Sequence, residues 1–207
     1  MLARGEIDEE GWHREVANVL VPVYLSGENP RAQSGSSADE TEWEESRRPL
    51  LRAVDRSGSF IDIGCANGHL IESMKGWAAT DGITLEVYGV EIAPELADLA
   101  RRRLPEWRDR IWTGNAYDFE PPQLFDFVRV GLEYVPPSRR REFIQRLLTR
   151  YLVQGGRLVV GMHTELRSEG SIEHTVAEWG NVIAGHVEVP HRDPRTVRRA
   201  FWIDRER

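Results

Sequence analysis

The sequence is short of cysteine and of long apolar runs, and each shortage excludes a class of protein. One Cys in 207 residues excludes a disulfide framework and a cysteine-rich zinc site, and it suits a reducing compartment. Because no run of about 18 apolar residues occurs, no membrane-spanning helix is expected. The first residues are acidic, whereas a signal peptide starts with basic ones. These features predict a cytoplasmic protein with no membrane partner.

Basic residues are also scarce relative to acidic ones. The net charge is −7, and Lys75 is the single lysine. Most of the imbalance lies in residues 1–48, which hold 11 acidic residues and five arginines. This charge argues against a nucleic-acid partner, because a phosphate backbone attracts basic surfaces. The length suits one domain with a sizeable core, and we expect a monomer or a homodimer.

Residues 1–48 are predicted to form a helical cap rather than an independent domain. Residues 9–25 have the spacing of a short amphipathic helix that ends near Pro22. Residues 26–41 are rich in Gly, Ser, Asn and Pro, the composition of a loop. A second helix, interrupted near Pro49, is expected to follow. A loop of this length needs a functional explanation, so we expect it to act as a lid.

The remaining residues, 49–207, are predicted to form the main domain, in which short apolar strands alternate with helices. This alternation predicts a parallel sheet covered on both faces. Two last strands have only a turn between them and must pair antiparallel. The predicted fold is an α/β Rossmann-like three-layer sandwich, whose seven-stranded, mostly parallel sheet has its last strand reversed. The expected strands are SFIDI, LEVYGVE, RIWTG, FDFVRV, RLVVGM, GHVEVP and TVRRAFWID; the expected helices are GHLIESMKGWAA, PELADLARRRL, PPSRRREFIQRLLTRYL (closed by QGG) and about 171–184.

The stretch FIDIGCANGHL, residues 60–70, joins the first strand to the first helix of that domain. Ligands of open α/β sheets bind beyond the carboxyl ends of the strands. Gly64 permits a sharp turn there, and Gly68 lets a ligand approach the helix N-terminus. The loop departs from the dinucleotide fingerprint G-x-G-x-x-G, because Ala66 replaces the middle glycine. Asp62 would repel a diphosphate and attract an ammonium or sulfonium, which disfavours a nicotinamide-dependent oxidoreductase.

The stretch D-I-G-C-A-N-G resembles the first motif of the class I S-adenosylmethionine-dependent methyltransferases, of the bacterial small-molecule type. Three further segments are similar to that family in the right order, and the resemblance covers roughly residues 55–163. They are GVEIAPELADLARRR, TGNAYDF and FDFVRVGLEYVPPSRRREFIQRLLTRYLVQGGRLVVG. The resemblance implies S-adenosylmethionine as cofactor, S-adenosylhomocysteine as its product, no metal, and in-line methyl transfer to a small-molecule acceptor.

The resemblance also implies which residues hold the cofactor. Its amino-acid end is expected on Asp62 and on residues 64–68, the glycine loop. Its ribose is expected on Glu91, and its adenine beside Ile92 and Asn115. Asn115 stands where the family more often has Asp. The cofactor-binding residues expected are Asp62, Gly64, Cys65, Ala66, Asn67, Gly68, Glu91, Ile92, Asn115, Ala116, Tyr117 and Gly131. Cys65 is expected to be an inert thiol covered by the cofactor.

The acceptor is expected to enter over the loop after the fourth strand, beneath the cap. His163 ends the fifth expected strand and is a candidate general base; the alternative is a polar residue at a strand end. The remaining histidines lack the spacing of a metal site. Two other functions stay open, RNA or protein methylation and a catalytically inactive cofactor-binding protein. The acceptor contacts expected are Leu132, Glu133, Tyr134, Tyr24 and Trp43.

Overall fold

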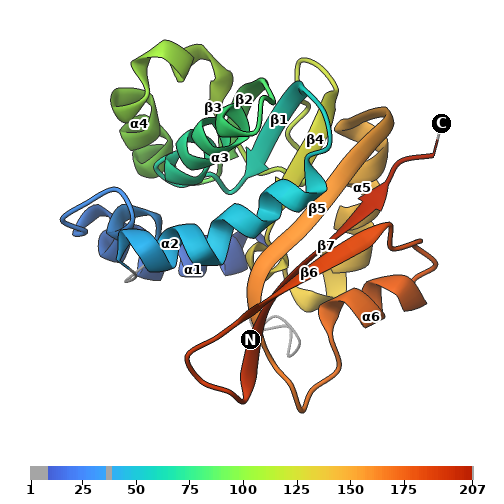
Figure 1. Ribbon diagram of the computed structural model, residues 1–207. Helices are drawn as coiled ribbons and strands as arrows, with labels where there is room; N and C mark the ends of the chain where they lie inside the picture. The colour runs from blue at the N-terminus through green and yellow to red at the C-terminus, as the bar shows by residue number, and fades with distance from the viewer. Residues whose placement is uncertain (1–8, 36–38, 207) are drawn as a thin grey trace.

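A computed structural model, which describes residues 9–35 and 39–206, contains one mixed sheet with helices on both faces (Figure 1). Its strands are β1 (Gly58–Ile63), β2 (Leu85–Glu91), β3 (Ile111–Thr113), β4 (Phe125–Val130), β5 (Leu152–Leu166), β6 (Gly185–Pro190) and β7 (Thr196–Asp204). They lie in the order β3-β2-β1-β4-β5-β7-β6. β1 to β5 are parallel, and β7 runs antiparallel to β5 and β6. The predicted fold class is confirmed, and the reversed strand lies between β5 and β6.

The helices pack two apolar clusters against the sheet. One cluster lies against α3 and includes Phe60, Met74 and Phe127, and the other lies against α5 and includes Phe125 and Leu147. The helices are α1 (Glu9–Leu25), α2 (Glu40–Arg47), α3 (His69–Thr80), α4 (Pro94–Arg103), α5 (Arg140–Arg150) and α6 (Ile172–Glu178), with 3-10 turns η2 (Ala32–Ser34), η3 (Arg48–Ala53), η4 (Pro105–Arg110), η5 (Leu132–Tyr134) and η6 (Pro137–Arg139). In the described ranges, every helix is too short or too polar to cross a bilayer.

Strand order reverses between β1 and β4, which are neighbours at the centre of the sheet. β1 is followed in the chain by strands on one side of it, and β4 by strands on the other. The connections after the two strands therefore leave in opposite directions and open a crevice at the carboxyl ends. This topology positions the candidate site before any side chain is considered.

The limits of several elements differ from the sequence prediction. α1 continues past Pro22 to Leu25, because the Ser26 N–H donates to the Pro22 carbonyl (3.0 Å) and completes the last turn. The Gly-Gly pair expected to precede the fifth strand lies inside β5, where a register shift opposite Phe125 and Phe127 accommodates it. α6 ends at Glu178 because Gly180 takes a left-handed φ of 94°.

The cap follows α1 with a folded turn rather than an unstructured loop. The Asn29 Oδ1 accepts the Ala32 N–H (3.0 Å), and Gln33 Nε2 donates to the Gly27 carbonyl (3.0 Å), so residues 27–34 close on themselves. Residues 1–8 and 36–38, which belong to the predicted cap and lid, lie outside the described residues. The division into a cap at 1–48 and a main domain at 49–207 stays a prediction.

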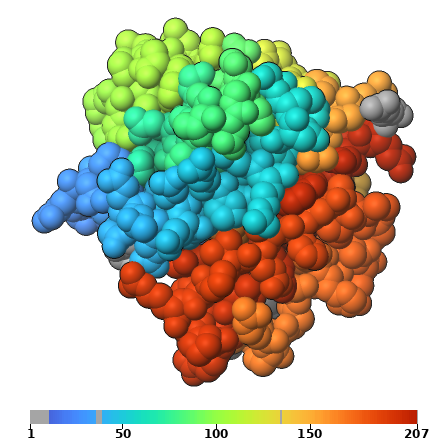
Figure 2. All heavy atoms as spheres, in the orientation of Figure 1, coloured from blue at the N-terminus to red at the C-terminus, as the bar shows by residue number. Residues whose placement is uncertain are grey.

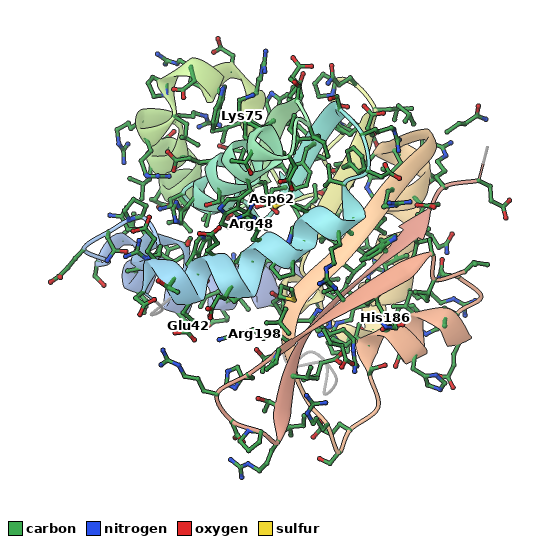
Figure 3. The ribbon with its side chains drawn as sticks, in the orientation of Figure 1. Glu42, Arg48, Asp62, Lys75, His186 and Arg198 are labelled. Carbon is green, nitrogen blue, oxygen red and sulfur yellow. The ribbon has the colours of Figure 1, made fainter. Side chains whose placement is uncertain are left out.

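The cap packs between the α3–α4 region and the C-terminal strands. In Figure 2 the blue and cyan N-terminal residues form a continuous band between the green α3 and α4 region and the red C-terminal strands. Glu42 of α2 binds two arginines from the β6–β7 hairpin region, Arg198 (2.9 Å, Figure 3) and Arg192 (2.6 Å). The cap is therefore attached to the hairpin that carries the reversed strand.

Substitutions at two glycines, Gly89 and Gly76, can test how closely the residues around β2 and α3 pack. A Cβ at Gly89 would lie 2.7 Å from Cys65 Sγ and 2.8 Å from Ile71 Cδ1, whereas a Cβ at Gly76, on the exposed face of α3, would meet nothing within 4 Å. We expect Gly89→Ala to lower the free energy of unfolding by about 1–3 kcal/mol through overpacking. Gly76→Ala should raise it by up to about 1 kcal/mol through helix propensity. Urea unfolding measures both, and a neutral Gly89→Ala would contradict the packing described.

Candidate functional site

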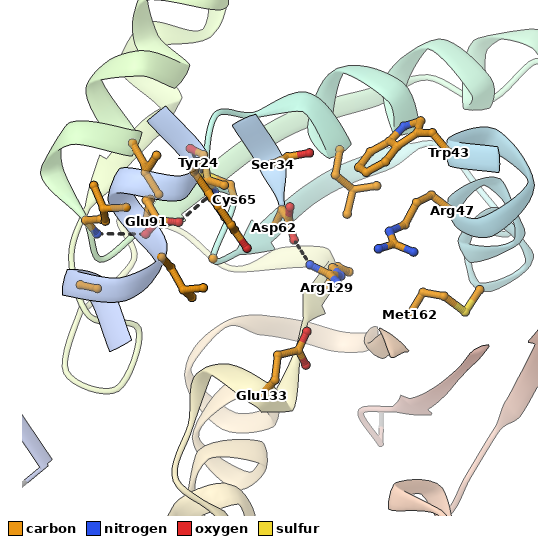
Figure 4. A pocket seen from close by; sticks show the side chains of 18 residues that line it. Tyr24, Ser34, Trp43, Arg47, Asp62, Cys65, Glu91, Arg129, Glu133 and Met162 are labelled. Atoms are coloured by element: carbon orange, nitrogen blue, oxygen red, sulfur yellow. Dashed lines mark hydrogen bonds and ion pairs between the residues drawn. The ribbon is translucent and has the colours of Figure 1, made fainter. Parts of the chain in front are cut away.

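A cavity of about 130 Å³ opens at the carboxyl ends of the central strands, beneath α1 and α2 (Figure 4). Each of four adjacent strands or the turn after it supplies a side chain: Glu91 from β2, Asp62 from β1, Arg129 from β4 and Met162 from β5. Three carboxylates and two guanidiniums line the cavity, so its formal charge is −1. The charged residues are Asp62, Glu91, Glu133, Arg47 and Arg129.

Asp62 and Arg129 form a buried ion pair at the floor of this cavity. They are register partners on the parallel strands β1 and β4, so their side chains point to the same face. Arg129 Nη1 lies 3.1 Å from Asp62 Oδ1, and the two side chains are 6% and 2% exposed. Arg129 Nε also donates to the Gly161 carbonyl (2.6 Å). Burial, partly offset by Arg129, raises the pKa of Asp62 to about 6.

Sequence reasoning found Asp62 and missed Arg129. A signal was available, because FIDI and FDFVRV each place one charged residue next to the last apolar residue of a buried strand. Neighbouring strands of a parallel sheet would bring two such residues together. Without the strand order, however, the sequence does not show that β1 and β4 are neighbours.

Glu91 holds the glycine loop against the start of α4. Its Oε2 accepts the Ala66 N–H (2.8 Å), and its Oε1 accepts the Ala93 N–H (2.9 Å). The carboxylate is nearly buried, which raises its pKa despite those two hydrogen bonds. Ala66 adopts a positive φ of 47°, which few residues other than glycine accept. Glu91 therefore both lines the cavity and stabilises a strained turn.

The glycine loop presents only part of itself to the cavity. Gly64, Cys65 and Ala66 line it, whereas Asn67 is buried away from it and Gly68 packs on Leu104, whose Cδ1 would lie 2.5 Å from a Cβ there. Gly68 thus has a packing contact with Leu104, and its expected role in making room for a ligand stays a prediction. Burial raises the pKa of the Cys65 thiol well above its ordinary value, so the thiol stays protonated.

Asn67 connects the loop to the cap. Its Oδ1 accepts the His69 N–H (3.1 Å) at the start of α3, and its Nδ2 donates to the Pro30 carbonyl (2.8 Å). The cap is therefore hydrogen-bonded directly to the loop that borders the cavity. A role for Asn67 in positioning the cap is what this geometry supports.

A second cavity of about 50 Å³ lies on the other side of the glycine turn, and Gly64 borders both cavities. Ile92, Asn115 and Ala116 line it, as does His13 of α1. Asn115 also closes its own turn, because its Oδ1 accepts the Tyr117 N–H (3.1 Å). Tyr117 lies outside the lining and stacks on Phe143, with ring centroids 5.8 Å apart.

Three of the residues expected to contact the acceptor line the larger cavity, namely Tyr24, Trp43 and Glu133. Leu132 is fully buried in the apolar cluster beside α5 and does not reach it. Gly131 precedes η5 and is also absent from the lining. The side chain of Tyr134 lies outside the described part of the chain.

His163 is not among the residues that line the cavity, although it follows Met162, which is. Its Nε2 lies 3.1 Å from Glu165 Oε1. Glu165 also accepts the Ile172 N–H (2.7 Å) and binds Arg199 Nη1 (2.6 Å). β5 continues to Leu166, so His163 lies inside the strand rather than at its end, and its place in this network favours a structural polar role.

The cap contributes more to the cavity than the sequence indicated. Val21 and Tyr24 of α1 pack on an apolar cluster of Ala66, Ala93 and Leu96. Burial, with Glu91 and Glu133 nearby, raises the pKa of Tyr24. The lining residues that sequence reasoning missed in the cap are Ala17, Leu20, Val21, Ser34 and Arg47. Amphipathic spacing predicted that one face of α1 is buried, but not what lies against it.

Comparison with known proteins agrees with these observations. Residues 60–156 match the family described as a methyltransferase domain. No curated protein matches the sequence. Three solved structures illustrate the fold. The N-methyltransferase NodS from Bradyrhizobium japonicum WM9, in complex with S-adenosylhomocysteine, is 17% identical (92% of this chain, 98% of that chain, TM-score 0.64).

A second is the 1,6-didemethyltoxoflavin-N1-methyltransferase of Burkholderia thailandensis, 15% identical (97% of this chain, 92% of that chain, TM-score 0.68). A third is the magnesium protoporphyrin IX methyltransferase ChlM from Synechocystis PCC 6803 with bound S-adenosylmethionine, 16% identical (97% and 98%, TM-score 0.63). At such identities these likenesses show the fold. Residues 60–156 are therefore similar to a methyltransferase domain, and the fold is that of the class I S-adenosylmethionine-dependent methyltransferases.

Proposed function

We propose that this protein transfers a methyl group from S-adenosylmethionine to a small-molecule acceptor. The observation that carries the proposal is the cavity at the strand ends, whose charged lining sums to −1. The cofactor carries an ammonium, a sulfonium and a carboxylate and is therefore +1. Opposite charges attract more strongly in a site of low dielectric constant than in water. The negatively charged lining thus fits this cofactor better than it fits a dinucleotide, whose diphosphate would add negative charge.

The residues around the two cavities suit the parts of the cofactor in order. Asp62 and the Gly64 turn suit the amino-acid end, and Glu91 suits the ribose hydroxyls. The smaller cavity, with Ile92 and Asn115, suits the adenine ring. Because Gly64 borders both cavities, an elongated ligand that crosses the glycine turn would meet all of these groups.

When bound, the cofactor supplies a methyl group attached to a good leaving group, so in-line transfer depends on alignment more than on acid–base catalysis. The residues of this chain would align the acceptor and exclude water. Tyr24 and Trp43 cover the cavity from the cap, and Arg47 and Glu133 offer charged contacts to a polar acceptor. Because α1 and α2 cover a cavity of only about 130 Å³, a small acceptor is favoured over RNA or protein.

Glu91→Gln tests the ribose contact. The amide keeps one acceptor for the glycine loop but loses the charge, and hydrogen bonds to a charged group contribute about 1.5–3 kcal/mol. We expect the affinity for S-adenosylhomocysteine, measured by calorimetry, to fall by about ten- to hundredfold. Glu95→Ala, at an exposed acid in the first turn of α4, is the control and should bind normally. Absence of binding to the unmodified protein at millimolar ligand would refute the proposed function.

The pKa of Asp62, raised by burial to about 6, predicts a pH dependence of cofactor binding. An ammonium binds the carboxylate, so below pH 6 the ligand must first displace a proton. The affinity should rise as the pH increases from 5 to 7, by up to about tenfold per unit below 6, and then level off. Calorimetry in two buffers of different ionisation enthalpy should detect proton release at pH 5.5 and little at pH 8. Asp62→Asn should abolish this proton release; an unchanged proton release in that variant would assign the titration elsewhere.

Tyr24 tests the role of the cap. It lines the cavity, so Tyr24→Ala removes apolar contact and admits water, and we expect cofactor affinity to fall about tenfold. Val23, its neighbour on α1, is 61% exposed, so Val23→Ala should leave affinity unchanged. Calorimetry with S-adenosylhomocysteine compares the two variants. Equal affinities would show that α1 does not close over the ligand.

A further inference from the structure

Two polar side chains of the larger cavity, Tyr24 and Glu133, have no protein partner. Figure 4 shows both directed into the cavity, Tyr24 from α1 and Glu133 from the turn after β4. Within residues 9–35 and 39–206, neither the Tyr24 hydroxyl nor the Glu133 carboxylate makes a hydrogen bond or an ion pair. Asp62 and Glu91, in contrast, are already paired or hydrogen-bonded. Polar groups that face a cavity without a partner are available to a ligand.

The chain holds both groups in place. A Cβ at Gly35, where φ is 81°, would collide with Tyr24 Oη, so this glycine makes room for the hydroxyl. A Cβ at Gly131 would lie 2.6 Å from Glu133 Oε1, so the carboxylate lies against the backbone of its own turn. Arg140 Nε donates to two carbonyls of that turn (2.9 and 3.4 Å) and fixes it. The two groups are therefore preorganised for a ligand.

We infer that Tyr24 and Glu133 together bind the reacting hydroxyl group of an uncharged acceptor with an apolar body, and that Glu133 takes the proton of this hydroxyl. The inference rests on the proposed function and names the class of acceptor, which the proposed function leaves open. The acceptor O–H donates to the Glu133 carboxylate, and the Tyr24 O–H donates to one lone pair of the acceptor oxygen. The other lone pair remains for the bond to the methyl group.

A hydroxyl group suits this pair of side chains better than an amine does. A hydroxyl has one donor and two lone pairs, so it can satisfy Glu133 and Tyr24 and still attack carbon. A neutral amine has one lone pair, which the new bond to carbon needs, so the Tyr24 O–H would stay unpaired. Burial and the nearby Glu91 and Glu133 raise the pKa of Tyr24, so its hydroxyl keeps the proton and is a donor.

An uncharged acceptor with an apolar body fits the rest of the lining, which includes Leu20, Leu70 and Met162. The charged residues of the lining sum to −1, and the cofactor is +1. A neutral acceptor therefore adds no net charge to the loaded site. An anionic acceptor would instead place a second negative charge beside Glu133, which is unfavourable in a site of low dielectric constant.

The proton balance of the transfer gives Glu133 its role. When the acceptor oxygen bonds to the methyl carbon, the electron pair of the broken S–C bond stays on sulfur, and the positive charge passes to the acceptor oxygen. The O–H proton then moves to the Glu133 carboxylate, which later releases it to water. The products are the methyl ether of the acceptor, S-adenosylhomocysteine and one proton. A carboxylate within hydrogen-bond reach of the O–H is what such a transfer requires.

The test compares phenol, anisole and aniline on the protein saturated with S-adenosylhomocysteine. Ligand-observed NMR measures the three affinities, because it suits weakly binding ligands of this size. Anisole lacks the O–H donor, so we expect phenol to bind about ten- to hundredfold more tightly, the range for a hydrogen bond to a charged group. Aniline lacks the second lone pair, so phenol should bind about two- to tenfold more tightly than aniline.

Each preference should depend on one of the two residues. Glu133→Ala should reduce the preference for phenol over anisole to about threefold or less. Tyr24→Phe keeps the ring over the cavity but removes the donor, so it should abolish the preference for phenol over aniline and keep the preference over anisole. Glu95→Ala, at the exposed acid of α4, is the control and should keep both preferences.

Two results with the unmodified, loaded protein would overturn the inference, and neither depends on whether a variant folds. They are the absence of phenol binding and equal affinities for phenol and anisole. A preference over anisole that persists in Glu133→Ala would also overturn it. Circular dichroism and thermal unfolding establish that each variant is folded. Failure of the unmodified protein to bind S-adenosylhomocysteine would instead refute the proposed function itself.

Discussion

The free-energy cost of burying charged groups determines how the candidate site is built. A parallel sheet covered on both faces offers little water to its central strands, so a carboxylate there must be paired or hydrogen-bonded. Asp62 has Arg129 as its partner, and Glu91 accepts two backbone N–H groups. Each solution recruits a second element: the first ties β1 to β4, and the second ties the glycine loop to α4. The positions of the glycine loop, α4 and the central strands β1 and β4 thus depend on the partners that compensate the charges of Asp62 and Glu91.

This arrangement also explains why burial raises the pKa values of both acids although each has partners. Their hydrogen bonds replace only part of the hydration that they lose, so both stay poised to accept a further positive group. A site whose carboxylates were fully compensated would have little to gain from a cationic ligand. Incomplete compensation on rigid strands is therefore the feature on which the proposed binding of a sulfonium and an ammonium rests.

Most of the sheet was predictable from sequence, because apolar runs bounded by turn residues mark strands directly. The limits of β2, β4, β6 and β7 coincide with the predicted segments. The predicted limits were wrong where strand pairing or backbone conformation overrode the local sequence pattern. The Gly-Gly pair before Arg157 suggests a helix end, but pairing with β4 extends β5 back to Leu152. Likewise, α6 has helical spacing beyond its observed end, and the backbone of Gly180 stops it.

In the candidate site, too, some residues were predictable from sequence and others were not. Residues on the βα turns, such as Asp62, Gly64 and Glu91, were found because motif order places them at one sheet edge, and they line the cavity. Arg129 was missed because recognising it requires the order of strands. The cap residues were missed because no local pattern states where a preceding helix docks.

The contacts that attach the cap to the rest of the molecule differ in character. Toward the glycine loop it is held by the buried amide of Asn67, which donates to the Pro30 carbonyl (2.8 Å), and by apolar packing of Val21 and Tyr24. Toward the C-terminal hairpin it is held through Glu42, which pairs with the exposed Arg192 and with the largely buried Arg198. An exposed ion pair such as that with Arg192 contributes at most about 1 kcal/mol and weakens with salt. The cap is held further on the α3 side, because Trp43, which lines the cavity, donates from Nε1 to Ser73 Oγ (3.1 Å) and stacks on His69. Its attachment to α3 and the glycine loop therefore combines part-buried hydrogen bonds with apolar packing, whereas its attachment to the hairpin depends on charge.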